Sequence, residues 1–286
     1  LEVKLHDSVP LTLDDAYEMD FKQRFPDYAS TDANSKWRIA RTMFELVIAG
    51  QNVEGIFEDE LLPAVKLAHP QLDVTDRALL PDLSAFVIEA DRYGQKMLAL
   101  HHQSLVDWLT TTNTLFKVNV ARGHRFLAKL TSQNDAWGCC RHVDLSDLTQ
   151  KQAFELFKQC SWADWKSDAA DVFHLANAVE SGSVAYSKYL LLPGYPPDGI
   201  PANGEPLENA LVMRPELAFI LLDAKAAVGT DHLDSAIFAH RRLGNSGLGT
   251  LLERASPSQT GVEIAVEADL IDVLELCMVK GTIIQS

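Results

Sequence analysis

Two short segments carry residue types that could do chemistry, and the first contains the residue types of a hydrolase catalytic triad. His101, Ser104 and Asp107 would supply the base, nucleophile and carboxylate of a catalytic triad. A triad is assembled from distant segments around a strained nucleophile turn, however, and the chain contains no Gly-x-Ser-x-Gly run. Strand-end histidines and a helix cap at Ser104 are the favoured interpretation, and a hydrolase with an unrecognised site stays as an alternative.

The second segment, Cys139-Cys140-Arg141-His142, offers the thiolate and imidazole ligands that zinc prefers. Adjacent cysteines fit a tetrahedral site poorly, and no second ligand pair follows at a standard spacing. We therefore predict a structural role for this segment and no metal site.

The sequence lacks the phosphate-binding motif that is typical of nucleotide-binding proteins. A phosphate-binding loop needs glycines followed by Gly-Lys-Ser/Thr, so that backbone amides and a lysine hold the phosphates. The most glycine-rich stretch, residues 244–249, has no such lysine and is interpreted as a turn between helices. We predict that the chain is not itself an enzyme and binds no cofactor.

The charge balance restricts the partners. The formal net charge is −15, the deficit is shared by both halves, and the only compact basic spot in the second half is His240-Arg241-Arg242. Nucleic acids and anionic membranes are recognised through clustered Lys and Arg, so neither is expected as a partner. No run of about 18 apolar residues occurs and only four cysteines are present, which predicts a cytoplasmic protein without a disulfide framework. Because it begins with Leu1, we also expect the chain to be a piece of something longer.

Helical periodicity is clearest near the start of the chain. A helix is predicted from residue 35 to a stop at Gly50, with Asn34 or Ser35 as its cap. Its apolar face consists of Ile39, Met43, Leu46 and Val47. A second helix is predicted over 58–68, where Pro63 is acceptable only in the first turn.

The elements that follow complete a domain. A third helix is predicted over 73–83, and the short apolar segments 86–88 and 97–100, separated by a polar turn, predict a β-hairpin. Another helix follows over 101–109. Three helices and a hairpin describe a winged-helix-like domain over residues 35–113, preceded by the end of another element in residues 1–34 and followed by a helical connector over 114–170.

The string around Trp108 resembles a known family. His101-His102-Gln103-Ser104-Leu105-Val106-Asp107-Trp108-Leu109, with the glycine-histidine pair Gly123-His124 further on, is similar to the end of the winged-helix region in STAND NTPases of the NACHT or TANC type that carry ankyrin repeats. This resemblance implies a nucleotide-binding domain upstream, which the present chain would hold inactive as a regulatory arm.

The last third shows an internal repeat. Ala178 and Ala210 lie about 32 residues apart, and each precedes an apolar helix that ends in a leucine pair. The pairs are Leu191-Leu192, Leu221-Leu222 and Leu251-Leu252, and the third copy contains Ala236. A fourth copy runs from Val262 to Gly281. Units of this kind bury their apolar faces only by stacking on neighbours, which predicts a helical solenoid over residues 171–286.

The repeat resembles the ankyrin family. Pro206-Leu207-Glu208-Asn209-Ala210 stands where that family has a threonine-proline-leucine-histidine-x-alanine run, and 221–226 is similar to its leucine-leucine-x-x-glycine-alanine ending. The chain departs from the family in the acidic Glu205 and Glu208, in Lys225 at the glycine of the ending, and in shortened third and fourth units. The resemblance implies degenerate ankyrin-like repeats.

The leading hypothesis from sequence is a mainly α, non-catalytic scaffold for protein–protein interaction. Its partner would be a protein, and the acidic balance favours a basic one. The residues expected at the tips of the inter-helix turns are Asp198, Asn203, Asp231 and His232.

Overall fold

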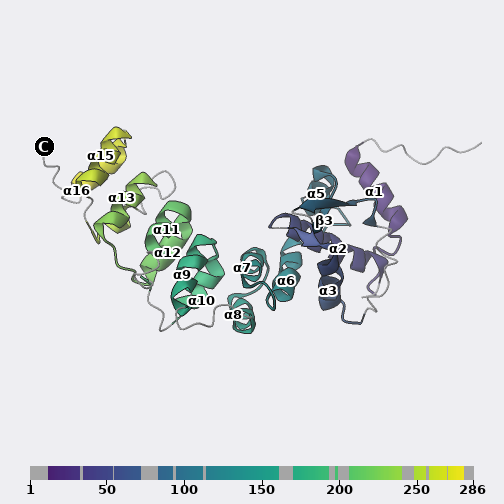
Figure 1. The fold of residues 1–286 in the computed structure, drawn as a ribbon. Coiled ribbons are helices and arrows are strands. Elements are labelled where there is room, and N and C mark those ends of the chain that lie inside the picture. Colours follow the sequence, from purple (N-terminus) through teal and green to yellow (C-terminus); the bar gives the residue numbers. More distant parts are fainter. Residues whose placement is uncertain are drawn as a thin grey trace, which may run out of the picture. The chain divides into compact units, whose positions relative to one another are not determined.

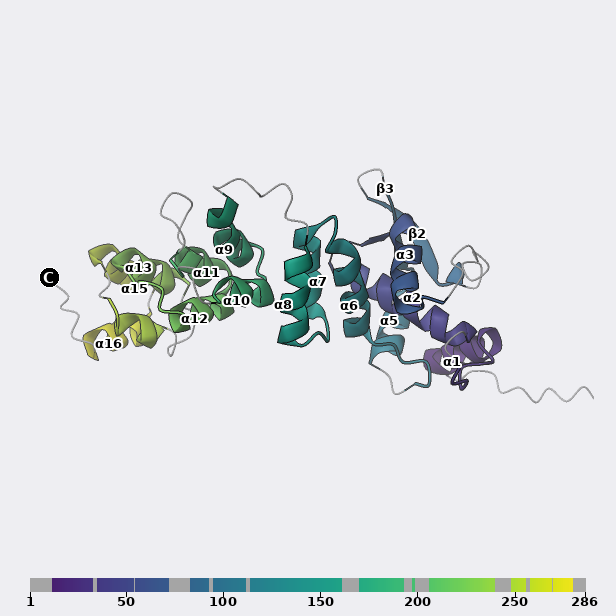
Figure 2. The same ribbon diagram turned by 90° about the horizontal axis from the view of Figure 1, so that it is seen from below.

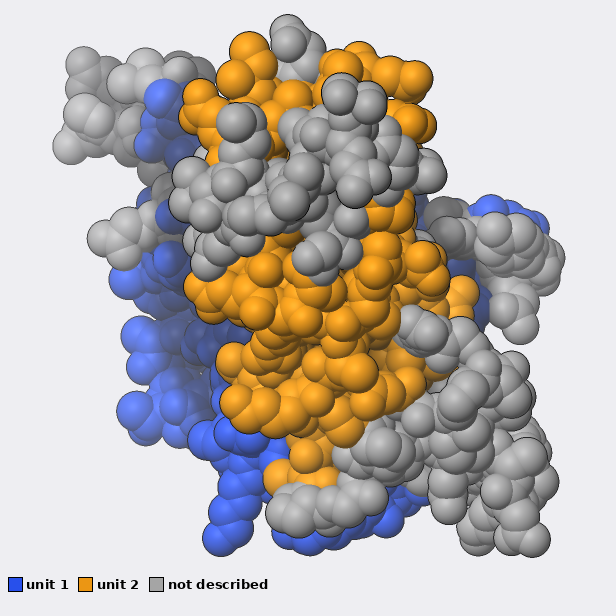
Figure 3. Space-filling view, turned by 90° about the vertical axis from the view of Figure 1, so that its left-hand side faces the viewer, with its two compact units in different colours: residues 1–161 blue, residues 162–286 orange. Residues whose placement is uncertain are grey.

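The computed structural model divides the chain into two compact units, residues 1–161 and 162–286, which are treated separately (Figures 1 and 3). The structure describes residues 12–32, 35–53, 55–71, 83–92, 95–111, 114–160, 170–192, 197–198, 206–239, 248–255, 258–268 and 270–279. These residues are mainly helical, as predicted. The third predicted helix lies outside the described residues except for residue 83. Residues 244–247 of the predicted glycine-rich turn also lie outside them, whereas residues 248 and 249 begin a short helix.

The first unit begins with two capped helices. Helix α1 (Leu13–Arg24) starts in a capping box between Thr12 and Asp15. Helix α2 (Lys36–Gln51) starts at Ser35, whose hydroxyl accepts a hydrogen bond from a first-turn amide, and it continues through Gly50 instead of stopping there. All four residues of the predicted apolar face of α2 are buried, which confirms the periodicity.

An aromatic cluster joins these two helices. The ring of Phe21 on α1 lies 5–6 Å, centroid to centroid, from six other rings, namely Phe25, Trp37, Phe44, Phe86, Trp108 and Phe116. Rings at such distances and tilted angles add attraction to the area they bury. The predicted boundary at residue 34 therefore runs through a continuous core.

Helix α3 (Glu58–Ala68) contains Pro63 as its sixth residue. The expectation that Pro63 lies in the first turn is wrong, because the sixth residue belongs to the second turn. Proline has no backbone N–H, so the helix lacks the hydrogen bond from residue 63 to the carbonyl of Asp59. The buried residues Leu61, Ala64 and Val65 pack into the core, and this burial offsets the loss.

A three-stranded antiparallel sheet follows in the order β1-β3-β2. The hairpin of β2 (Val87–Arg92) and β3 (Gln95–Leu100) is confirmed and is longer than the apolar segments indicated, with Val87 opposite Leu100 and Arg92 opposite Gln95. Sequence reasoning missed β1 (Ile56–Phe57), a two-residue strand that pairs with β3.

Four helices complete the first unit: α5 (Gln103–Thr110), α6 (Val120–Thr131), α7 (Ala136–Leu145) and α8 (Gln150–Gln159). Helix α6 crosses α2 closely at Gly123, where an added Cβ would lie 2.1 Å from the carbonyl oxygen of Glu45. The predicted connector, 114–170, is thus in part integral to the first unit, because Phe126 and Leu127 of α6 belong to the same core as α2.

The second unit consists of short helices in pairs. They are α9 (Ala170–Glu180) with α10 (Val184–Leu190), α11 (Pro206–Met213) with α12 (Pro215–Asp223), α13 (Thr230–Phe238) with a short helix at 248–252, and α15 (Gln259–Glu267) with α16 (Ile271–Val279). Helix α9 contacts α11, α11 contacts α13, and α13 contacts α15. In Figure 2 the first helices α9, α11 and α13 form one row and α10, α12 and α16 another.

Small residues lie where the first helices meet. Ala178, Ala210, Ala236 and Ala265, one on each of the four first helices, are each fully buried. The leucine pairs at 221–222 and 251–252 are also buried, whereas Leu192 of the first pair is 45% exposed. The main core cluster among the described residues of this unit is built from Leu, Ala, Val and Ile side chains, and Tyr186 of α10 is buried as well.

Candidate functional site

The three residues of the hypothetical triad point to different partners. The Nε2 atom of His101 lies 2.7 Å from the carbonyl oxygen of Ala85, and the hydroxyl of Ser104 lies 2.9 Å from that of Tyr17. The carboxylate of Asp107 accepts a hydrogen bond from a glutamine one turn earlier in α5. The hydroxyl of Ser104 also lies 3.4 Å from Nδ1 of His102, the histidine beside the expected one. The contacts of His101, Ser104 and Asp107 thus do not join the three residues in the serine–histidine–carboxylate order that the hydrolase hypothesis requires.

The cysteine–histidine segment is buried on α7 and enters two pairwise contacts. The Nδ1 atoms of His124 and His142 lie 2.9 Å apart, and the sulfur atoms of Cys139 and Cys160 lie 3.5 Å apart. Burial lowers the pKa of His124 to about 4 and that of His142 to about 3, so both rings are neutral at pH 7. Within the described residues no group of three or more His, Cys, Asp or Glu side chains is placed to hold a metal ion.

The four predicted partner-binding residues differ in their exposure and position. Asp198 and Asp231 are exposed, and the carboxylate of Asp198 also accepts a hydrogen bond from the amide of Ala227. Asn203 lies outside the described residues. His232 corrects the expectation of a turn-tip position: it is buried in the first turn of α13, and its Nδ1 accepts a hydrogen bond from the amide three residues earlier.

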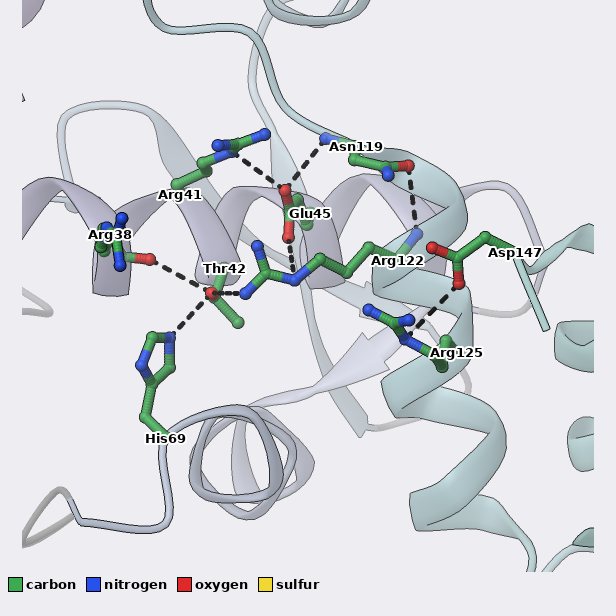
Figure 4. A network of polar contacts seen from close by, with 9 residues as sticks. All are labelled: Arg38, Arg41, Thr42, Glu45, His69, Asn119, Arg122, Arg125 and Asp147. Carbon is green, nitrogen blue, oxygen red and sulfur yellow. Dashed lines mark hydrogen bonds and ion pairs between the residues drawn. The ribbon is translucent and has the colours of Figure 1, made fainter. Parts of the chain in front are cut away.

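A buried carboxylate that sequence reasoning missed lies on α2 in the first unit (Figure 4). Glu45 on α2 is fully buried between two guanidinium groups, with N–O distances of 3.2 Å to Arg41 and 3.5 Å to Arg122, and it accepts a hydrogen bond from the amide of Asn119 at 3.0 Å. Burial raises the pKa of Glu45 and the two arginines oppose that rise. A signal for it exists in the sequence, since Glu45 interrupts a run of apolar residues from 43 to 49.

Thr42 links this carboxylate site to α3. Its hydroxyl lies 2.9 Å from Nε2 of His69, donates to the carbonyl of Arg38 at 3.1 Å, and accepts from the guanidinium of Arg122 at 3.4 Å (Figure 4). Helices α2, α3 and α6 are thus held together by polar contacts as well as by apolar packing. The network fixes Arg122 and with it the register of α6 on α2.

On the same helix α6, a hollow of about 690 Å³ opens beside α8. Its cationic members are Arg125, Lys129 and Lys151, and Arg125 is paired with Asp147 at 3.4 Å (Figure 4). The remaining lining residues are Leu67, Phe126, Ser132, Gln133, Leu148, Gln152, Glu155, Leu156 and Gln159. We refer to this hollow as the α6–α8 groove.

Phe126 provides the aromatic surface of the groove. The cationic groups of Arg122, Arg125 and Lys129 lie 5.6, 5.4 and 6.0 Å from the centre of its ring. Such positions are attractive because the face of the ring carries partial negative charge. The chain as a whole is strongly acidic, so this concentration of positive charge distinguishes the groove from its surroundings.

Comparison with protein families, curated proteins and solved structures finds no match for this chain. In the part of the chain that the structure describes, no helix combines the length and the apolar character needed to cross a bilayer.

Proposed function

We propose that the chain is a non-catalytic protein-binding scaffold, in which a winged-helix-like domain precedes a solenoid of degenerate ankyrin-like helix pairs. The observation that carries this proposal is the succession of contacts from α9 to α11, α13 and α15, with a fully buried alanine on each first helix. Arrays of this kind expose long surfaces formed by repeated turns, which suits them to binding proteins.

The backbone after α12 adds support. In the ankyrin family a glycine stands in the ending that Lys225 occupies here, and Lys225 has a φ of 73°, in the left-handed region that favours glycine. Gly182, which follows α9, has a φ of 76°. The turn after α12 thus adopts a conformation that would suit the glycine implied by the ankyrin resemblance, and this supports the proposal.

Neighbouring pairs are also tied by polar contacts. The carboxylate of Asp234 on α13 accepts hydrogen bonds from the amide and the hydroxyl of Ser258, the cap of α15. The guanidinium of Arg254 donates to the carbonyls of Leu222 and Ala226, which end the previous pair. Each tie joins one pair to the next, as a repeat array requires.

The first unit favours a second candidate function, that of a regulatory arm within a larger STAND NTPase. Helices α2 and α3, with β1 between them, precede the hairpin β2–β3, an order typical of winged-helix domains. Trp108 and Leu109, at the end of the string that resembles this family, are buried in the core. A Gly-Lys-Ser/Thr loop encoded upstream of residue 1 in the parent gene would favour this candidate over a free scaffold.

The scaffold proposal is tested by quantitative affinity capture with the full chain and its Asp231→Lys variant. Asp231 is exposed in the first turn of α13, whereas changing Asp198 would also remove a backbone contact. We expect basic partner proteins captured by the wild type to be lost with the variant and retained with Lys117→Glu in the first unit. A set of captured proteins that is the same for all three chains would contradict the proposal.

A further inference from the structure

We propose that the α6–α8 groove binds an acidic amphipathic helix of a partner protein. This site goes beyond the scaffold function proposed above, because it lies entirely in the first unit and takes a ligand of the opposite charge. The groove proposal can therefore be confirmed or refuted independently of the scaffold function proposed for the repeats.

Charge complementarity identifies the ligand. Lys129 and Lys151 are exposed on the two walls, and neither forms an ion pair with the described part of the chain. The acidic member of the lining, Glu155, is already paired with Lys158 at 2.8 Å, and Asp147 is paired with Arg125. Lys151 also helps to lower the pKa of Glu155, and Lys129 lies over the ring of Phe126. Three cations against one carboxylate still leave the lining with excess positive charge, which favours carboxylates on the ligand.

The apolar lining specifies the rest of the ligand. Leu67, at the end of α3, is 45% exposed into this groove, and Leu148, Leu156 and Phe126 line it further. A volume of about 690 Å³ is in the range that receives ligands. A helix with apolar anchors on one face and Asp or Glu beside them would satisfy both the walls and the floor.

A nucleic acid fits this groove less well than a peptide does. Glu155 lies among its three cations, Asp147 outside the lining pairs with one of them, Arg125, and the whole chain carries a charge of −15. Phosphate backbones gain affinity from many unopposed cations, which the groove lacks. Apolar anchors, in contrast, gain from burial of Leu67.

Contacts within the first unit order the side chains on both walls of the groove before a ligand binds. Arg122, which lies one turn before Phe126 and stacks on its ring, is fixed by Glu45 and Thr42. On the other wall, Lys151 and Gln152 occupy the first turn of α8, whose capping box at Thr149 orders that turn. A preformed site loses less conformational entropy when the ligand binds.

The test is a displayed library of helical peptides, each about four turns long, with leucine anchors and either Asp/Glu, Lys/Arg or Gln beside them. Peptides are selected on the full wild-type chain and counter-selected on the Lys129→Glu/Lys151→Glu double variant. Lys117→Glu, an exposed lysine outside the groove, is the matched control, and circular dichroism verifies that each variant is folded.

We expect the surviving peptides to be acidic, to bind the double variant at least about tenfold more weakly, and to bind the Lys117→Glu control unchanged. Leu67→Ser should weaken the same peptides about threefold to tenfold, and single-stranded DNA should fail to displace them. The proposal is overturned if no peptide survives counter-selection, if the survivors are basic or neutral, or if DNA displaces them.

Discussion

The two units are built around different kinds of core. In the first, the ring of Phe21 contacts six other aromatic rings drawn from several elements, and a charged network around Glu45 lies beside them. In the second, the main cluster of buried side chains among the described residues is aliphatic, with Tyr186 of α10 buried as well, and each first helix contacts the next along the chain. One unit depends on a shared centre, and the other depends on a series of neighbouring interfaces.

This difference predicts how far the destabilising effect of a single substitution should extend within each unit. A change at the shared centre removes contacts to many elements together, so the whole first unit should respond. A change at one interface of the second unit should affect the adjoining pairs most, because the stability of a repeat array is approximately a sum of neighbour terms.

The largest effect should come from acidification of the first unit. Burial lowers the pKa values of His124 and His142 to about 4 and about 3, whereas both return to about 6.5 on unfolding. The unfolded chain therefore binds more protons between pH 6.5 and 4, and stability falls as the pH falls through that range. By pH 4 the loss should be on the order of 3 kcal/mol for each histidine, measured by urea denaturation.

The His124→Leu/His142→Leu variant serves as the control for acidification, because it should lack this loss. Glu45 acts in the opposite direction, since its raised pKa favours protonation of the folded state, and its contribution cancels between the two proteins. Equal pH dependence in both proteins would show that the histidine pair does not govern acid stability.

The next largest effect should follow Phe21→Ala. Removing a fully buried ring leaves a cavity and should lower the free energy of unfolding of the first unit by about 4 kcal/mol. Fluorescence of the core tryptophans Trp37 and Trp108 would report the loss. Phe238→Ala in the second unit is the matched control, because that ring is 75% exposed and should cost under about 0.5 kcal/mol.

Gly123→Ala should destabilise the contact between α2 and α6. The new methyl group would lie 2.1 Å from a backbone oxygen, and relief requires the helices to separate. We expect a net loss of about 2 kcal/mol by thermal or urea denaturation, after the gain in helix propensity. Gly229→Ala, where a Cβ meets its nearest neighbour at 3.6 Å, should change stability by a few tenths of a kcal/mol.

In the second unit, Asp234→Ala should cost about 1.5 kcal/mol, because Ser258 loses a charged hydrogen-bond acceptor. Hydrogen exchange should quicken in α15 and α16 and stay unchanged in α9. The exposed Asp231→Ala is its matched control and should have little effect. Faster exchange throughout 170–279 in the Asp234→Ala protein would contradict the neighbour-by-neighbour account.

The smallest effect should be a gain. Lys225 occupies a left-handed backbone conformation that costs about 1 kcal/mol for a residue with a Cβ. Lys225→Gly should stabilise the second unit by up to about 0.5 kcal/mol, after the entropic cost of glycine, whereas Lys225→Ala should give no gain. A higher melting temperature for the alanine variant would rule out backbone strain as the cause.

Local patterns in the sequence predicted much of this fold. The cap at Ser35, the apolar face of α2 and the hairpin depend on neighbouring residues and are found. A helix is also found where residues 101–109 predicted one, but its cap is His102, and the expected cap Ser104 lies within its first turn. The spacing of Ala178 and Ala210 likewise marked positions that are fully buried on consecutive first helices.

Local patterns could not predict the contacts between residues that are far apart in the sequence. Phe21 reaches a core formed mostly by later elements, β1 is two residues long, and Glu45 is neutralised partly by Arg122, which lies 77 positions further along the chain. The pairing of His124 with His142 likewise depends on how α6 meets α7. The α6–α8 groove has the same origin, since Leu67, Lys129 and Lys151 come from three different helices.

Native-state hydrogen exchange of the full chain at increasing sub-denaturing urea concentrations tests the central contrast most directly. The account predicts that amides of α2, α5 and α6 converge on one opening free energy, while those of α9, α11, α13 and α15 keep a graded series of values. A single common opening free energy for the four first helices of the second unit would contradict it.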